Sequence, residues 1–276
     1  PHNQYSLDTM RHGITAAKKQ GIKHMFMTMW GDNGGECSKF SAIPALFYLA
    51  QFSRGVTDEE KIKAKFKSAF GISFDDFMLL DIPNNVTVNS DGKPKCPTKY
   101  MLYSDPFLGY MDYTVRKGGN EYYAECEEKL SAVAKKSRKY GYLFDTAAKL
   151  SGVLKYKYEL GVKTREAYKA GDKAELLRLA NEDYSGALRA ISAFAKSFEH
   201  QWYLDNKTYG FEVHDIRLGG LQRRVESCRR RLIDYANGKI DRIAELEEAI
   251  LPSPKSNECE SAYNNFYRNI ATSNAL

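Results

Sequence analysis

Cysteine is scarce in this sequence, and long apolar runs are absent from it. The cysteines are odd in number and widely scattered, with no CxxC pair and no nearby histidine at zinc-binding spacing: Cys37, Cys96, Cys126, Cys228 and Cys259. We therefore expect a reducing, cytoplasmic setting rather than a disulfide framework, and no metal or other cofactor. No apolar stretch is long enough to cross a bilayer, so no membrane partner is expected.

A concentrated basic face is also lacking. The formal net charge of +6 permits weak attraction to polyanions but falls short of what a dedicated nucleic-acid binder carries. The densest basic group flanks an apolar helical seam, where arginines usually form a solvated face with acidic partners: Arg223, Arg224, Arg229, Arg230 and Arg231. We expect no nucleic-acid partner; a nucleic-acid-binding bundle would instead show binding that depends steeply on salt.

The sequence opens on Pro1 rather than on a methionine. Its first residues also lack the order of basic, apolar and small residues that marks a signal peptide. These features favour a chain that is part of a longer protein.

Residues 1–55 have the pattern of one unit of an α/β fold. A helix is predicted over residues 6–20 with Ser6 as its N-cap, and another over residues 38–54. Between them, residues 24–30 form a nearly continuous apolar run that predicts a buried parallel strand, followed by a glycine-rich loop over residues 31–37. One strand cannot make a sheet, because its edges and both apolar faces would lack partners. We therefore place the remaining strands upstream of Pro1.

The rest of the sequence predicts a helical bundle. Residues 81–112 are the exception: they hold four of the eight prolines and predict a long irregular connection with turns. Helices are expected, the first of them capped at Thr57, over residues 57–70, 74–80, 122–140, 144–168, 173–206, 219–236 and 240–251. Within residues 219–236, alternating spacings of four and three predict a packing seam: Leu221, Val225, Cys228, Leu232 and Tyr235.

The glycine-rich loop carries the side chains that suggest a ligand. Trp30 offers a flat apolar face to a pyranose ring, and the carboxylates of Asp32 and Glu36 can accept hydrogen bonds from sugar hydroxyls. Loops after strand ends carry ligand chemistry in α/β barrels. The alternative is structural: Trp30 fills the core, and Asp32 or Glu36 caps the next helix at its positive end. The residues alone leave the two interpretations about equal.

The motif Thr-Met-Trp-Gly-Asp-Asn-Gly-Gly-Glu-Cys-Ser over residues 28–38, with Pro-Ala-Leu-Phe-Tyr over residues 44–48, resembles the eighth strand, loop and helix of a bacterial family 20 β-hexosaminidase barrel. Residues 206–207, 210–213, 215–217 and 219–221 resemble the helical C-terminal domain of one branch of that family. The resemblance implies a mostly α chain. Residues 1–55 would end a (β/α)8 barrel, and residues 56–276 would form the helical domain, with the irregular connection at about 81–112.

The implied activity is that of an exo-acting retaining β-N-acetylhexosaminidase. The partner would be a terminal β-linked N-acetylglucosamine or N-acetylgalactosamine of a glycan, whose own acetamido group acts as the nucleophile. The family's catalytic Asp-Glu pair follows the fourth barrel strand, and nothing in residues 1–55 corresponds to it, so no catalytic residue is assigned. Trp30 resembles the tryptophan of the terminal-sugar site and Asp32 the carboxylate that holds outer hydroxyls; Glu36 is carried over less directly.

Two functions are compatible with these features. In the first, an upstream barrel portion of the same protein completes the enzyme, and the helical domain braces it or mediates dimerisation. In the second, the chain is a non-catalytic helical interaction module, and residues 1–55 are only a packing cap. An upstream barrel with an Asp-Glu pair on a strand end would decide for the enzyme.

Overall fold

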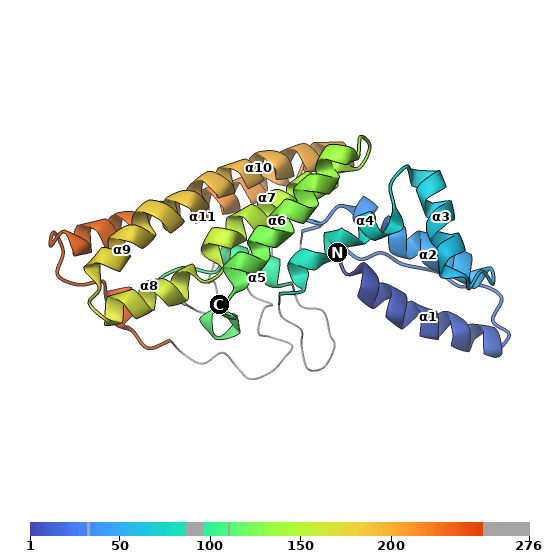
Figure 1. Ribbon diagram of the computed structural model, residues 1–276, viewed down its shortest axis with the longest axis horizontal. Coiled ribbons are helices and arrows are strands. Elements are labelled where there is room, and N and C mark those ends of the chain that lie inside the picture. Colours follow the sequence, from blue (N-terminus) through green and yellow to red (C-terminus); the bar gives the residue numbers. More distant parts are fainter. Residues whose placement is uncertain (32–33, 87–95, 110, 251–276) are drawn as a thin grey trace.

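The structure is a computed structural model that describes residues 1–31, 34–86, 96–109 and 111–250, and within these ranges it contains helices but no strands (Figure 1). The α-helices are α1 (Asn3–Lys19), α2 (Ile43–Ser53), α3 (Glu59–Phe70), α4 (Phe74–Met78), α5 (Pro97–Tyr103), α6 (Gly119–Lys136), α7 (Gly141–Lys157), α8 (Leu160–Lys169), α9 (Lys173–Leu179), α10 (Ser185–Asp205), α11 (Phe211–Ala236) and α12 (Ala244–Glu247). Shorter 3₁₀ turns are η1 (Lys39–Ala42), η2 (Leu79–Asn84) and η3 (Asp112–Thr114).

The long helices form the predicted bundle. Helix α7 packs against both α6 and α10, and α10 packs against α11. The seam of α11 is confirmed, because Leu221, Val225, Cys228 and Leu232 are all buried in a core shared with α10. Figure 1 shows α8 and α9 at one end of an elongated molecule and α1 to α4 at the other.

Helices α1 to α4 are joined to the bundle by a second core. Leu7 of α1, Leu49 of α2 and Phe66 of α3 are buried in the same apolar cluster as Leu130 of α6 and Phe144 of α7. This part of the chain therefore rests directly on α6 and α7. The division into residues 1–55 and 56–276 stays a prediction.

The predicted strand over residues 24–30 is absent from the described structure. The segment has no regular secondary structure, and all its side chains except the partly buried Met27 are solvent-exposed, with Phe26 at 92% and Trp30 at 81% of full exposure. The apolar pattern fits a strand, but a strand forms only when neighbouring strands satisfy its backbone groups. The described part of this chain supplies no such neighbour.

Two predicted helix caps are wrong. Helix α1 begins at Asn3, and the Ser6 hydroxyl lies inside it, donating to the carbonyl of His2 at 3.0 Å. The N-cap of α3 is Asp58 rather than Thr57, since the Asp58 carboxylate accepts the Lys61 amide at 3.1 Å. A carboxylate at this position also interacts favourably with the positive end of the helix dipole.

Four helical boundaries also differ from the prediction. Helix α5 lies inside the stretch expected to be irregular, while residues 87–95 of that stretch lie outside the described residues. The helix predicted over residues 144–168 is divided into α7 and α8, and that over residues 240–251 is reduced to α12. Helix α11 begins eight residues before the predicted start at Gly219, because buried side chains on its first turns stabilise a helix that the glycine pair alone disfavours.

The helix predicted over residues 173–206 is present with one irregularity. A π-helical segment, Ala180–Tyr184, joins α9 to α10. The Ala180 carbonyl there accepts from Arg229 Nε at 3.1 Å and from the Ser185 hydroxyl at 3.1 Å. Donors from outside the helix ladder are a recognised cause of such bulges.

Candidate functional site

Glu36 is the centre of a polar cluster where the glycine-rich loop meets the helical bundle. Its carboxylate forms an ion pair with Lys99, with Oε2 and Nζ 2.8 Å apart. The other oxygen, Oε1, lies 3.6 Å from His214 Nδ1 and 3.8 Å from Arg217 Nη1. The backbone carbonyl of Glu36 accepts a hydrogen bond from Gln201 Nε2 at 3.3 Å. Side chains of α5, α10 and α11 thus converge on one residue of the loop.

Helix α5 supplies two members of this cluster. It begins at Pro97, a favoured first helical residue because its missing N–H would have no helical acceptor there. Lys99 and Tyr103 lie one turn apart, and the Lys99 side chain is only 15% exposed. The guanidinium carbon of Arg217 lies 3.7 Å from the centre of the buried Tyr103 ring, a cation–π contact that fixes α5 against α11.

Aromatic packing fixes the start of α11. The indole N–H of Trp202 donates to the Lys207 carbonyl at 2.9 Å, which holds the turn between α10 and α11. The buried Phe211 ring lies 5.6 Å from Phe198 and 5.9 Å from Trp202. His214 follows one turn later, with its ring 5.2 Å from that of Trp202 and almost fully buried. Its contacts with the rings of Phe198, Trp202 and Phe211 make this histidine part of the packing between α10 and α11.

Burial determines the charges in the cluster. Burial lowers the pKa of His214 below its usual value, although the nearby Glu36 charge opposes the change, so the imidazole is neutral at neutral pH. Burial also lowers the pKa of Lys99, again opposed by Glu36. The pKa of Tyr103 is raised by burial, and the Glu36 charge adds to the effect. The positive charges that balance Glu36 therefore come from Lys99 and Arg217.

The structure describes two of the three sugar-binding candidates, and their surroundings differ. Trp30 projects into solvent, and its indole N–H donates to the Thr28 hydroxyl at 3.0 Å, so it does not fill the core of this chain. Asp32 lies outside the described residues. Glu36 does not cap the next helical turn, because Ser38 is the N-cap of η1 and Glu36 turns toward Lys99. Sugar binding by Trp30, Asp32 and Glu36 stays a prediction.

Sequence patterns did not indicate the partners of Glu36. Lys99 lies in the stretch predicted to be irregular, and Gln201 lies within a predicted helix, between His200 and Trp202. His214 and Arg217 have helical spacing, and Arg217 falls in a segment on which the family resemblance rests, but nothing local points to an acid more than a hundred residues away.

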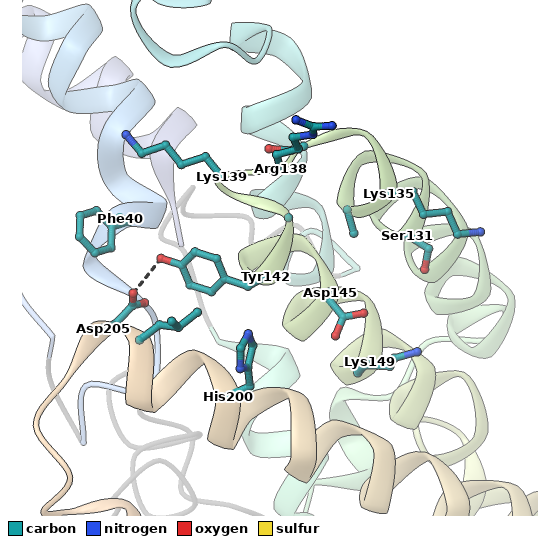
Figure 2. A pocket seen from close by; sticks show the side chains of 14 residues that line it. Phe40, Ser131, Lys135, Arg138, Lys139, Tyr142, Asp145, Lys149, His200 and Asp205 are labelled. Carbon is teal, nitrogen blue, oxygen red and sulfur yellow. Dashed lines mark hydrogen bonds between the residues drawn. The ribbon is translucent and has the colours of Figure 1, made fainter.

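An open groove of about 750 Å³ lies between α6, α7 and the end of α10 (Figure 2). Its rim carries the basic residues Lys135, Arg138, Lys139 and Lys149. Its acidic groups are already engaged: Tyr142 donates to Asp205 Oδ1 at 2.7 Å, and Ser197 donates to Asp145 Oδ2 at 2.6 Å. The groove is mixed in charge and has the character of a surface depression between helices.

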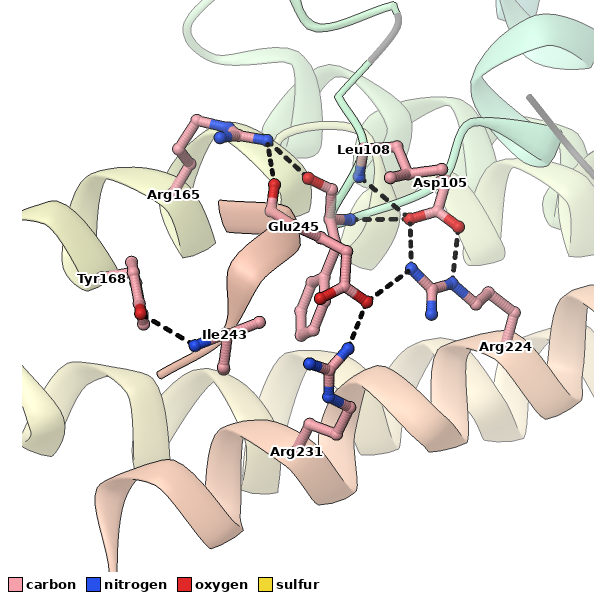
Figure 3. A network of polar contacts seen from close by, with 9 residues as sticks. Asp105, Leu108, Arg165, Tyr168, Arg224, Arg231, Ile243 and Glu245 are labelled. Atoms are coloured by element: carbon pink, nitrogen blue, oxygen red, sulfur yellow. Dashed lines mark hydrogen bonds and ion pairs between the residues drawn. The ribbon is translucent and has the colours of Figure 1, made fainter. Parts of the chain in front are cut away.

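A second polar network fastens α11 to the chain segments around it (Figure 3). Asp105 accepts from Arg224 Nε at 2.6 Å and from its Nη2 at 3.2 Å, while Arg231 pairs with Glu245 just before the end of the described chain. The buried Arg165 guanidinium donates to the carbonyl of Leu246 at 2.8 Å. The expected acidic partners of the arginines are present, but the pairs are partly buried rather than fully solvated.

In the described part of the chain, no group of three or more His, Cys, Asp or Glu side chains is arranged to hold a metal ion. No helix in the same ranges is long and apolar enough to span a membrane.

A model of the Glycoside Hydrolase 20C C-terminal domain family matches residues 75–264. The chain belongs to this family. A comparison with curated proteins found no match. Membership confirms the resemblance drawn from the sequence and agrees with the helical architecture. It places the chain in the setting of the family 20 glycoside hydrolases, which implies a glycan substrate and association with a catalytic domain. The match begins after residue 55, so the barrel-end assignment stays a prediction.

Proposed function

We propose that this chain is part of an exo-β-N-acetylhexosaminidase that releases terminal β-linked N-acetylglucosamine or N-acetylgalactosamine. In this proposal residues 1–55 supply the last strand, loop and helix of a (β/α)8 barrel, and residues 56–276 form a helical support domain. An upstream portion of the same protein supplies the rest of the barrel. Membership in the family supports the glycoside hydrolase setting.

The exposed apolar segment before the glycine-rich loop is the observation that carries the barrel assignment. Ile22, Met25, Phe26, Met29 and Trp30 are each between 42% and 92% exposed. Soluble proteins rarely leave a contiguous apolar patch in water unless it serves as an interface. A central barrel strand is apolar on both faces, so pairing with barrel strands would bury these side chains and satisfy the backbone.

We propose that the catalytic groups and the sugar-binding side chains lie on different portions of the protein. Substrate-assisted cleavage needs an acid to protonate the leaving oxygen and a carboxylate to orient the acetamido nucleophile. We place both on the upstream portion, with Trp30 stacking on the terminal sugar and Asp32 accepting from its outer hydroxyls. The chain by itself is then inactive. We expect the complete enzyme to need no cofactor and to act in the cytoplasm. Dimerisation through the helical domain remains a prediction.

The test uses the full-length protein with aryl β-N-acetylglucosaminide and the matching galactosaminide. Trp30→Ala removes a stacking surface and should lower kcat/KM by roughly 100-fold, a loss on the order of 3 kcal/mol. Tyr5→Ala is the control, because Tyr5 is an exposed aromatic on α1 outside the proposed pocket. Wild-type kinetics for Trp30→Ala would contradict the proposal. A full-length protein with no glycosidase activity would favour the helical interaction module.

A further inference from the structure

Glu36 faces the helical domain rather than the open side of the loop. Its Oε2 is held by Lys99, and its Oε1 is buried in the chain next to His214 and Arg217. Both carboxylate oxygens are therefore directed at groups of α5 and α11. A sugar hydroxyl could reach this carboxylate only by displacing one of them.

Two glycines lie in the backbone directly before Glu36. Gly34 and Gly35 directly precede it, with φ angles of +107° and +60° that other residues rarely adopt. The side chains proposed to bind sugar, Trp30 and Asp32, lie only a few residues before these glycines. Because glycines leave the backbone many accessible conformations, the position of the loop depends on contacts made from outside it.

Contacts from the bundle hold the described end of the loop at Glu36. Lys99 lies on α5, Gln201 on α10 and Arg217 on α11, and all of them reach the same residue. Helix α5 is in turn held against α11 by the cation–π contact of Arg217 with Tyr103. A partly buried ion pair is well suited to this role, since breaking it leaves a charge without compensation and the loop cannot shift at small cost.

We propose that Lys99 and Arg217 are positioning residues of the sugar pocket, acting through Glu36, so that the helical domain sets how well the loop presents Trp30 to the sugar. This inference rests on the proposed function. It assigns Glu36 to the junction between loop and bundle rather than to the sugar, and it gives the helical domain a part in substrate affinity.

The primary variant is Lys99→Met in the full-length enzyme, which keeps the length of the side chain and removes its charge. A displacement of the loop by about 1 Å costs up to roughly 100-fold in such sites, so we expect kcat/KM to fall between tenfold and 100-fold, chiefly through KM. Lys99→Arg restores the charge and most of the activity. Lys155→Met is the matched control: it breaks a comparable, partly buried pair with Glu127 at 2.6 Å on α7 and α6 and leaves the kinetics unchanged.

A double-mutant cycle shows whether the effect passes through Trp30. In a Trp30→Ala enzyme the loop has lost its stacking side chain, so adding Lys99→Met or Glu36→Gln costs little more. Wild-type KM for Lys99→Met overturns the inference, and so does a Glu36→Gln loss that persists in full in the Trp30→Ala enzyme, since Glu36 would then bind sugar itself. If Lys99→Met does not fold, the same double-mutant cycle is carried out with Glu36→Gln. Failure of the proposed function is a separate result, namely wild-type kinetics for Trp30→Ala and Asp32→Asn.

Discussion

The ion pair between Asp105 and Arg224 offers a quantitative test of how the bundle is stabilised. Asp105 is only 2% exposed, and its Oδ1 accepts from the amides of Phe107 and Leu108 at 2.8 and 3.1 Å and from Arg224 Nη2 at 3.2 Å. Its Oδ2 accepts from Arg224 Nε, at 2.6 Å. Asp105→Asn keeps the shape, and its new amide nitrogen takes the Oδ2 place, where it meets the Arg224 N–H as a second donor.

The expected cost follows from these contacts. One hydrogen bond to a charged group contributes about 1.5–3 kcal/mol, and breaking a buried pair costs about 3–5 kcal/mol. Arg224 keeps 29% exposure and has Glu245 at 4.0 Å, so the lower end applies. We expect Asp105→Asn to reduce the free energy of unfolding by about 3 kcal/mol, or the melting temperature by roughly 6–12 °C.

Urea unfolding followed by far-UV circular dichroism at pH 7 measures this loss. The control is Glu125→Gln, which breaks an exposed pair with Lys129 at 3.4 Å and should cost less than about 0.5 kcal/mol. Equal urea midpoints for the two variants would refute the assignment of Asp105 as a stabilising centre.

The loss of stability caused by Asp105→Asn should depend on pH. Burial alone would raise the pKa of Asp105, but the hydrogen bonds and charge of Arg224, with the two backbone amides, hold the pKa below its usual value. The stability that the carboxylate supplies is therefore complete above the unfolded-state pKa of about 4 and is lost as the pH falls through the lower folded-state pKa. The difference between wild type and Asp105→Asn should shrink as the pH falls below about 4.

Two further predictions concern substitutions at single positions. Burial raises the pKa of Asp112 to about 6, so ionising its carboxyl group opposes folding. The free energy of unfolding should therefore fall as the pH rises from about 4 to about 6. Asp112→Asn should raise the free energy of unfolding by roughly 1–2 kcal/mol at pH 8 but not at pH 4, whereas equal effects at both pH values would contradict this. Gly119→Ala would place a Cβ 2.1 Å from the buried Tyr158 ring and should destabilise by about 3 kcal/mol, while Gly219→Ala, with open space around its Cβ, should stabilise by about 0.5–1 kcal/mol in the same denaturant assay.

Most of the helices could be predicted from the sequence. The spacing of Leu221, Val225, Cys228 and Leu232 is a local property, and it correctly indicated which face of α11 is buried. Glycines and prolines act within a few residues, and the ends of α1, α2, α3, α10 and α11 lie within one residue of the prediction. The family resemblance also rested on short stretches of sequence, and the family match confirms it.

Tertiary structure decided the features that depend on distant partners. The apolar pattern of residues 24–30 fits a strand, yet no strand forms there, because its backbone needs neighbours that the described chain does not supply. Helix α11 runs through Gly219 because His214 and Leu218 pack against the rest of the bundle. Glu36 meets Lys99 and Arg217 only when the loop, α5 and α11 are brought together. Local propensity extends over a few residues, whereas burial of charge and apolar surface is settled by whichever segments the folded chain places side by side.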